Sequence, residues 1–208
     1  IYEGLENFQA FFIANIFGWR YKTDAKKYRY REVDLFIPRK NTKTFLAALI
    51  FIILMLTEDD YSEFYSICLD RDLAGEVKKA ISQILNVSPS VGQYFNIPKT
   101  LSGRLECTLT HSFYQPRTAE ANRNNSIKPS AFIADEFGAM KDNSNVEAMK
   151  SGQLNIRNPL MFRLTSAYAE DKSIMLGELD YLKKIYKGLE TDERLFALVY
   201  YATEEHLW

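Results

Sequence analysis

Short apolar β-like segments alternate with helical segments along most of this chain, and this alternation is the strongest constraint on its fold. Parallel neighbouring strands need crossover connections, so strands separated by helices predict an α/β fold with a mostly parallel central sheet flanked by helices. The predicted strands span residues 33–37, 64–69, 105–114, 131–134, 160–165 and 195–201, and the predicted helices span 42–56, 72–85 and 174–186.

Composition narrows the class of protein. The chain has 208 residues, 47% of them hydrophobic, which is enough for one full core, so we expect one domain over residues 1–208. A formal net charge of -1 gives no global basic surface, so any contact with DNA must be local or come from other chains.

The longest apolar run, residues 45–56, is shorter than the roughly 18 to 20 residues of a membrane span. It therefore predicts a buried helix, and we expect no membrane partner.

Cysteine and histidine indicate no metal or disulfide chemistry. Cys68 and Cys107 each lie in an apolar stretch and form no CxxC pair, which fits a reducing cytoplasm. His111 and His206 are too far apart in sequence for a local metal motif. No secretory signal is visible at the start of the sequence.

A basic turn follows the first predicted strand, in the place where sheets of this kind bind ligands. The turn, Pro38 to Thr44, leads directly into the apolar helix. Backbone N–H groups and the helix dipole there would attract phosphate, the Lys43 ammonium would lie on the β/γ oxygens, and the Thr44 hydroxyl would ligate Mg²⁺. Ile37 and Thr42 stand where the usual pattern has glycines, and the alternative interpretation is a solvated basic loop.

Two adjacent acids end the apolar strand at residues 131–134. An acid at the tip of a buried strand can hold the Mg²⁺ of a nucleotide, and a neighbouring carboxylate can deprotonate the attacking water. We predict these roles for Asp135 and Glu136, respectively. The alternative is that the pair caps the next helix or faces solvent. At the end of the strand at 160–165, Thr165 and Ser166 are candidate sensors of the γ-phosphate, with an ordinary turn as the alternative.

Together these segments make the chain resemble the large terminase subunits of tailed bacteriophages over nearly its whole length. The matching segments are residues 8–19, IPRKNTKT at 37–44 as a deviant Walker A motif, FIADE at 132–136 as Walker B, and LTSA at 164–167 as the coupling motif. Arg39, Lys40, Asn41 and Lys43 match the Walker A pattern of the family, whereas Thr42 replaces its glycine.

The resemblance implies a P-loop NTPase of the additional-strand type, with Mg²⁺ and ATP. Glu136, Arg39 and Lys43 would be catalytic, together with an arginine supplied to a neighbouring subunit, for which Arg123 is the candidate and Arg117 the second choice. Asp135 and Thr44 would hold the metal, and Thr165 and Ser166 would couple hydrolysis to movement. The nucleotide-binding residues would be Gln9, as the adenine-reading glutamine, and Arg39, Lys40, Asn41, Thr42, Lys43 and Thr44.

The resemblance also implies biological partners. It predicts a homo-oligomeric ring, docked on the portal protein of an empty capsid in the cytoplasm of an infected bacterium, that pumps double-stranded DNA with help from a small terminase subunit. Residues from about 168 to 208 are a candidate lid subdomain, and the nuclease domain of the family is expected to lie outside this chain. Two alternatives remain: a helicase-like nucleic-acid-dependent ATPase, or a degenerate nucleotide-binding assembly module, which the missing glycines would suit.

Overall fold

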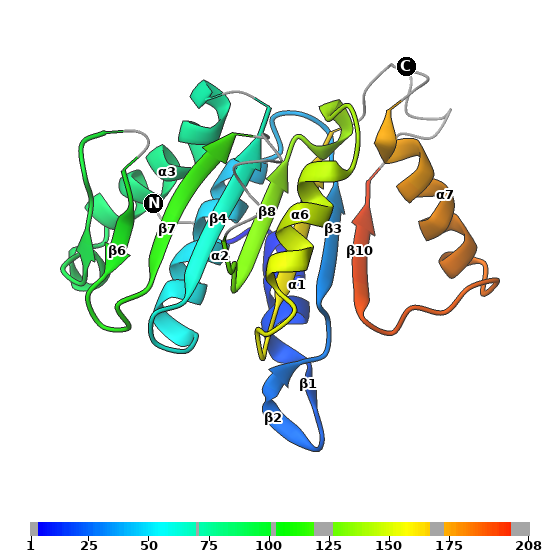
Figure 1. Ribbon diagram of the computed structural model, residues 1–208, viewed down its shortest axis with the longest axis horizontal. Helices are drawn as coiled ribbons and strands as arrows, with labels where there is room; N and C mark the ends of the chain where they lie inside the picture. Colours follow the sequence, from blue (N-terminus) through cyan, green and yellow to red (C-terminus); the bar gives the residue numbers. More distant parts are fainter. Residues whose placement is uncertain (1–3, 70, 101–102, 119–126, 167–172, 201–208) are drawn as a thin grey trace.

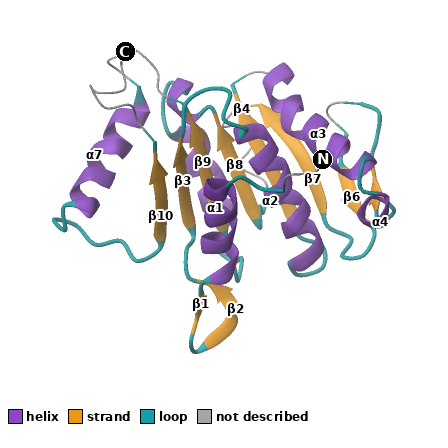
Figure 2. Ribbon diagram, turned by 180° about the vertical axis from the view of Figure 1, so that it is seen from behind, coloured by secondary structure: helices purple, strands orange, loops and turns teal. Residues whose placement is uncertain are grey.

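The computed structural model describes residues 4–69, 71–100, 103–118, 127–166 and 173–200. Its centre is an eight-stranded sheet with helices on both faces (Figures 1 and 2). The helices are α1 (Asn7–Gly18), α2 (Lys43–Thr57), α3 (Arg71–Asn86), α4 (Pro89–Gly92), α6 (Ser144–Gly152) and α7 (Ile174–Tyr186), with a 3-10 turn η1 (Phe137–Ala139). The strands are β1 (Arg20–Tyr21), β2 (Asp24–Tyr28), β3 (Glu32–Phe36), β4 (Glu63–Cys68), β5 (Phe95–Asn96), β6 (Leu105–Cys107), β7 (Phe113–Thr118), β8 (Ala131–Asp135), β9 (Leu160–Thr165) and β10 (Leu195–Val199).

The order of strands across the sheet is β10-β3-β9-β8-β4-β7-β6-β5. The six strands from β10 to β7 are parallel, and β6 and β5 join antiparallel, so the predicted mostly parallel α/β sheet is confirmed. β9 lies between β3, which precedes the basic turn, and β8, which carries the two acids. This inserted strand is the additional strand that the family resemblance implied, and it brings the carboxyl ends of β3, β8 and β9 to one edge of the sheet.

One predicted strand is wrong. The segment 105–114 forms two strands, β6 and β7, that pair antiparallel around a tight turn, with the Cys107 N–H donating to the Ser112 carbonyl at 2.9 Å. His111 takes the left-handed conformation in this turn, with φ of 55°. No glycine, proline or asparagine marks the reversal, so the sequence resembles one continuous strand. β7 then continues to Thr118.

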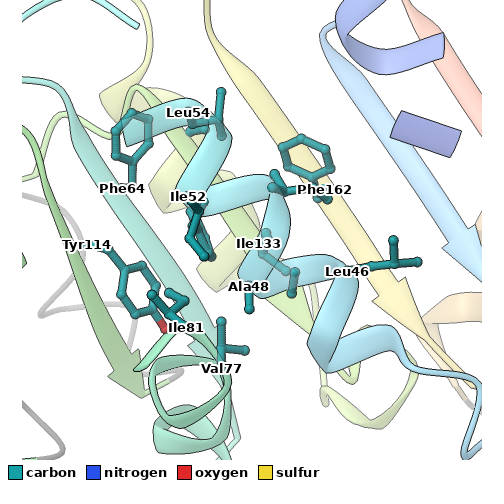
Figure 3. Close-up of a cluster of buried hydrophobic side chains, with 14 of the residues drawn as sticks. Leu46, Ala48, Ile52, Leu54, Phe64, Val77, Ile81, Tyr114, Ile133 and Phe162 are labelled. Atoms are coloured by element: carbon teal, nitrogen blue, oxygen red, sulfur yellow. The ribbon is translucent and has the colours of Figure 1, made fainter. Parts of the chain in front are cut away.

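Helix α2 forms the centre of the larger core. Its nearly unbroken apolar sequence buries Leu46, Ile50 and Leu54 completely, in one cluster with apolar residues of the sheet, α1 and α3. Figure 3 shows Leu46 and Leu54 of this cluster with Val77 and Ile81 of α3. Burial of this kind stabilises the fold by about 1.5 to 3 kcal/mol for each large side chain. The predicted buried helix is therefore confirmed, and within the described residues no helix is both long and apolar enough to cross a bilayer.

The opposite face of the sheet carries α6 and α7. Phe132 and Met161 pack there with Val146 and Met149 of α6. Further along the sheet, α7 packs Met175 and Leu182 on Phe36, next to β10. The segment predicted as a lid thus contains α7 and β10, and β10 pairs in parallel with β3 in the central sheet.

A network of ion pairs around the buried Arg163 joins strands and helices on this face of the sheet. The Arg163 guanidinium on β9 donates to both carboxylate oxygens of Asp34 on β3, at 2.6 and 3.0 Å, and lies 2.8 Å from Glu178 Oε1 of α7. Glu32 lies 3.4 Å from the same guanidinium and accepts from Lys150 of α6 at 2.9 Å. Burial raises the pKa of Asp34 to about 7, although Arg163 lowers it. Two strands and two helices therefore meet at one arginine.

Gly152 allows α6 to approach the backbone that leads into β8. An added Cβ there would lie 2.3 Å from the Ile127 carbonyl oxygen. We expect Gly152→Ala to lower the free energy of unfolding by about 1 to 3 kcal/mol, because a backbone clash must be relieved by movement. Urea unfolding checks this, with Gly177→Ala as the matched control. An added Cβ at Gly177 of α7 meets no atom within 4 Å, so that change should stabilise by about 1 kcal/mol. Similar stabilities for the two variants would contradict the packing argument.

Candidate functional site

The basic turn between β3 and α2 is folded on itself at the carboxyl edge of the sheet. The Asn41 side-chain amide donates to the carbonyls of Pro38 and Arg39, at 3.0 and 3.2 Å, and so closes the loop. Arg39, Lys40 and Asn41 are exposed, whereas Lys43, the first residue of α2, is only 8% exposed. The loop thus presents charged side chains to solvent and one buried ammonium group to the interior of the site.

Thr42 adopts the backbone conformation that normally requires glycine. Its φ and ψ are 59° and 24°, in the left-handed region, and Lys40 also has a positive φ of 67°. Holding a residue other than glycine in that region costs on the order of 1 to 3 kcal/mol, and a β-branched residue is rare there. The loop therefore keeps the shape associated with the glycine of the pattern, although the glycine itself is missing.

The buried lysine meets the acid-tipped strand. Lys43 Nζ donates to Glu136 Oε1 at 2.9 Å, joining residues that are 93 positions apart in the sequence. Asp135, at the end of β8, is 8% exposed and accepts at Oδ1 from the Glu136 N–H at 3.0 Å. Burial raises the pKa of the Asp135 carboxyl, Lys43 opposes this by its charge, and Glu136 adds to it. Glu136 itself has a positive φ of 51°, which turns the chain sharply after the strand.

The carboxyl end of β9 reaches the same place. Ser166 Oγ donates to Glu136 Oε2 at 3.5 Å, a long contact. Thr165 is completely buried, and its hydroxyl accepts from the Gly138 N–H at 3.0 Å and donates to the Ser166 carbonyl. The structure thus brings together Lys43, Asp135, Glu136, Thr165 and Ser166.

Gln9 of α1 also contacts the loop. Its amide nitrogen donates to the Thr42 hydroxyl oxygen at 2.6 Å, and its amide oxygen accepts from the Glu6 N–H at 2.9 Å. Gln9 is only 4% exposed. Gln9 is therefore buried and directed at the basic turn.

The two arginine candidates are placed differently. Arg123 lies outside the residues that the structure describes. Arg117 lies within β7, with its guanidinium carbon 5.1 Å from the centroid of the Tyr65 ring. In the sheet, β7 is separated from the acid-bearing β8 by β4.

Two residues at the site were missed from the sequence. The Ser173 hydroxyl donates to the Gly138 carbonyl at 2.6 Å, while the Gly138 N–H contacts Thr165, so Gly138 connects the start of α7 to the end of β9. Ser173 also accepts from the Met175 N–H as the N-cap of α7. A serine directly before a predicted helix is a readable capping signal, whereas nothing in the sequence singles out Gly138.

The site offers oxygen ligands of the kind that Mg²⁺ prefers. The Asp135 carboxylate and the Thr44 hydroxyl belong to the end of β8 and the first turn of α2, the two elements that Lys43 and Glu136 join. Among the described residues, no group of three or more His, Cys, Asp or Glu side chains could hold a metal. Mg²⁺ in nucleotide sites is bound through one or two protein oxygens, with phosphates and waters completing its shell, so this small ligand set fits it.

Comparison with known proteins gives one family. A sequence model described as "Terminase large subunit, ATPase domain" matches residues 7–184. No curated protein matches the sequence significantly.

Solved structures share the fold. The large terminase of bacteriophage HK97 superposes with a TM-score of 0.80 at 21% identity, covering 97% of this chain and 40% of that chain. The large terminase of a thermophilic bacteriophage gives 0.64 at 12% identity, covering 95% and 46%. The N-terminal domain of the DNA packaging ATPase of bacteriophage phi29 gives 0.53 at 14% identity, covering 82% and 90%. The chain thus spans less than half the length of the first two relatives.

Proposed function

The chain belongs to the family of terminase large subunit ATPase domains, and from this membership we propose that it hydrolyses ATP to drive double-stranded viral DNA into a procapsid. The observation that carries the proposal is the meeting of Lys43 and Glu136 at 2.9 Å beside the carboxyl ends of β3, β8 and β9. A phosphate-binding lysine and a catalytic acid must reach the same triphosphate, and this geometry supports both roles.

Lys43 and Glu136 would change partners when nucleotide binds. The Lys43 ammonium would move from the Glu136 carboxylate to the β/γ-phosphate oxygens, since a phosphate carries more negative charge and more acceptor oxygens. Glu136 would then be available to orient and deprotonate the attacking water. The ion pair therefore keeps the base occupied until the lysine has another partner.

The remaining loop residues would hold the phosphates. Backbone N–H groups from Lys40 to Thr44 and the start of α2 would bind phosphate oxygens, and Arg39 would polarise the γ-phosphate. Thr44 and Asp135 would hold Mg²⁺, which neutralises charge on the phosphates during transfer. Asp135 is suited to this role because a cation would restore the ionised form that burial disfavours.

Coupling would run through β9. Ser166 contacts Glu136, and Thr165 contacts Gly138, which in turn contacts Ser173 at the start of α7. A change at the γ-phosphate could thus reach α7 through hydrogen bonds of the described residues. Arg123 of a neighbouring subunit in a homo-oligomeric ring would stabilise transition-state charge.

The proposed partners follow from the family. They are double-stranded DNA, the portal protein and the small terminase subunit, at the portal vertex of a procapsid in the host cytoplasm. The phi29 relative, described as a DNA packaging ATPase, supports the packaging role, and its solved N-terminal domain is covered over 90% of its length.

Titration of the chain with Mg-ATP tests the nucleotide site. We expect Lys43→Ala to weaken binding by about 10- to 100-fold, because charged hydrogen bonds to phosphate are lost and Glu136 loses its partner. Lys26→Ala, at an exposed position of β2, is the matched control and should bind as the parent does. Absence of Mg-ATP binding, or equal affinity of Lys43→Ala and the parent, would favour the degenerate assembly module.

A second experiment separates the packaging motor from a helicase-like ATPase. The full-length protein that contains this domain should package DNA only with portal-bearing procapsids. Strand separation or stimulation by single-stranded nucleic acid, without any dependence on procapsids, would favour the helicase-like alternative.

A further inference from the structure

The hydroxyl of Thr42 holds a buried amide beside the phosphate loop. Gln9 Nε2 donates to Thr42 Oγ1 at 2.6 Å, and the Thr42 hydroxyl donates onward to the Asn41 carbonyl at 2.7 Å. The second anchor of this amide is the Glu6 N–H, which donates to Gln9 Oε1 at 2.9 Å. The Gln9 amide thus donates one hydrogen bond and accepts another, and these two bonds fix the orientation of its nitrogen and its oxygen.

We propose that Thr42 is a positioning residue for base recognition: its hydroxyl orients Gln9 so that the glutamine selects adenine over guanine. This inference rests on the proposed nucleotide site and adds a role that a glycine at position 42 could not supply. Thr42 acts through Gln9 and needs no contact with the base itself.

The hydrogen-bonding capacity of Gln9 supports adenine as the partner. A glutamine amide has two N–H donors and an oxygen with two lone pairs, so the contacts to Thr42 and Glu6 leave one donor and one lone pair. Adenine presents an acceptor at N7 next to a donor at N6, which is the complementary pair. Guanine presents acceptors at both N7 and O6, so its O6 would oppose the Gln9 oxygen.

An exposed aromatic residue, Tyr200, lies beside the start of the phosphate loop and packs against α1. The Tyr200 N–H donates to the Phe36 carbonyl at 2.7 Å, which places Tyr200 at the end of β3, where the loop begins. Tyr200 is 43% exposed, and its ring packs edge-on against Phe8, the neighbour of Gln9 in α1, with ring centroids 5.9 Å apart. A purine that reached Gln9 would find an aromatic surface close by, and aromatic side chains commonly stack on bases.

Two variants of Thr42 distinguish the effect of its hydroxyl group from the effect of the shape of the loop. Thr42→Val keeps the β-branched form and removes the hydroxyl, whereas Thr42→Ser keeps the hydroxyl. The affinities of Mg-ATP and Mg-GTP are measured by titration for each protein. We expect Thr42→Val to reduce the preference for ATP over GTP by roughly 2- to 10-fold, the range for one hydrogen bond. Thr42→Ser should retain the preference of the parent.

A double-mutant cycle tests whether the hydroxyl acts through Gln9. Gln9→Ala should reduce the same preference, and adding Thr42→Val to it should cause no further loss, because the hydroxyl then has no amide to hold. Equal weakening of ATP and GTP by Thr42→Val, an unchanged ratio, or additive losses in the double variant would overturn the inference while the proposed function stands. A parent chain that binds no Mg-ATP would overturn both.

Discussion

Glu136→Gln is expected to lower ATP turnover by about 100- to 10,000-fold while Mg-ATP binding is retained, because an amide cannot take the proton of the attacking water. Glutamine has the same shape, and its amide oxygen can still accept from Lys43, so the contact between α2 and the end of β8 is kept. The loss should therefore appear in kcat and not in the affinity for nucleotide.

The measurement is steady-state hydrolysis by the assembled full-length protein, since residues from a neighbouring subunit contribute to turnover in the proposed ring. Glu147→Gln is the matched control, because Glu147 is exposed on α6 and the change removes the same charge. Hydrolysis by Glu136→Gln at the rate of the parent would remove Glu136 as the base. A loss of Mg-ATP binding in step with turnover would instead give Glu136 a structural role.

Arg163→Met is expected to lower the free energy of unfolding by about 3 to 5 kcal/mol at pH 8, the range for breaking a buried ion pair. Methionine fills similar volume but leaves Asp34, which is completely buried, without its two charged hydrogen bonds. Urea unfolding at several pH values measures the effect. Arg157→Met, at an exposed ion pair with Asp24, is the control and should change stability by less than about 1 kcal/mol.

The raised pKa of Asp34 determines how the loss of stability in Arg163→Met depends on pH. Since the pKa of Asp34 is raised from 3.8 to about 7 in the folded chain, the native state holds a proton that the unfolded state has released between those values. Stability from this group is present at low pH and is lost as pH rises through that window. Without Arg163 the pKa should rise further, so the variant should lose least near pH 4 and most above pH 7. A pH-independent loss would contradict this account, and Asp34→Asn in the variant should restore part of the stability.

Long apolar segments explain why so much of the fold could be predicted from the sequence. The strand before the basic turn, the helix at 42–56 and the strand at 160–165 each consist mainly of apolar residues, and each forms within one residue of its predicted ends. The reversal near His111 was missed because its residues favour an extended chain. The hydrophobic pattern of the sequence also could not predict that β9 lies between β3 and β8, because the order of strands along the chain does not fix their order across a sheet.

The residues of the candidate site were predictable where a motif marks them, and the links between them were not. Lys43 and the acid pair stand out by type and position, and the structure brings them together. The contact between Gln9 and Thr42 joins residues 33 positions apart, and the burial of Arg163 depends on helices covering both sides of its strand. An arginine within a strand looks like a solvent-facing residue until the tertiary packing is known.

The location of β3 also has a consequence for how the protein folds during synthesis. Both of its neighbours, β9 and β10, are made after the whole of α2, β4, α3 and β8. A nascent chain that has emerged only as far as Asp135 thus carries an apolar strand with two open edges, and such edges invite wrong pairing between chains. Ribosome-bound intermediates should consequently need protection by chaperones until Val199 has left the exit tunnel, and the proposed nucleotide site can form only after β9 has been made.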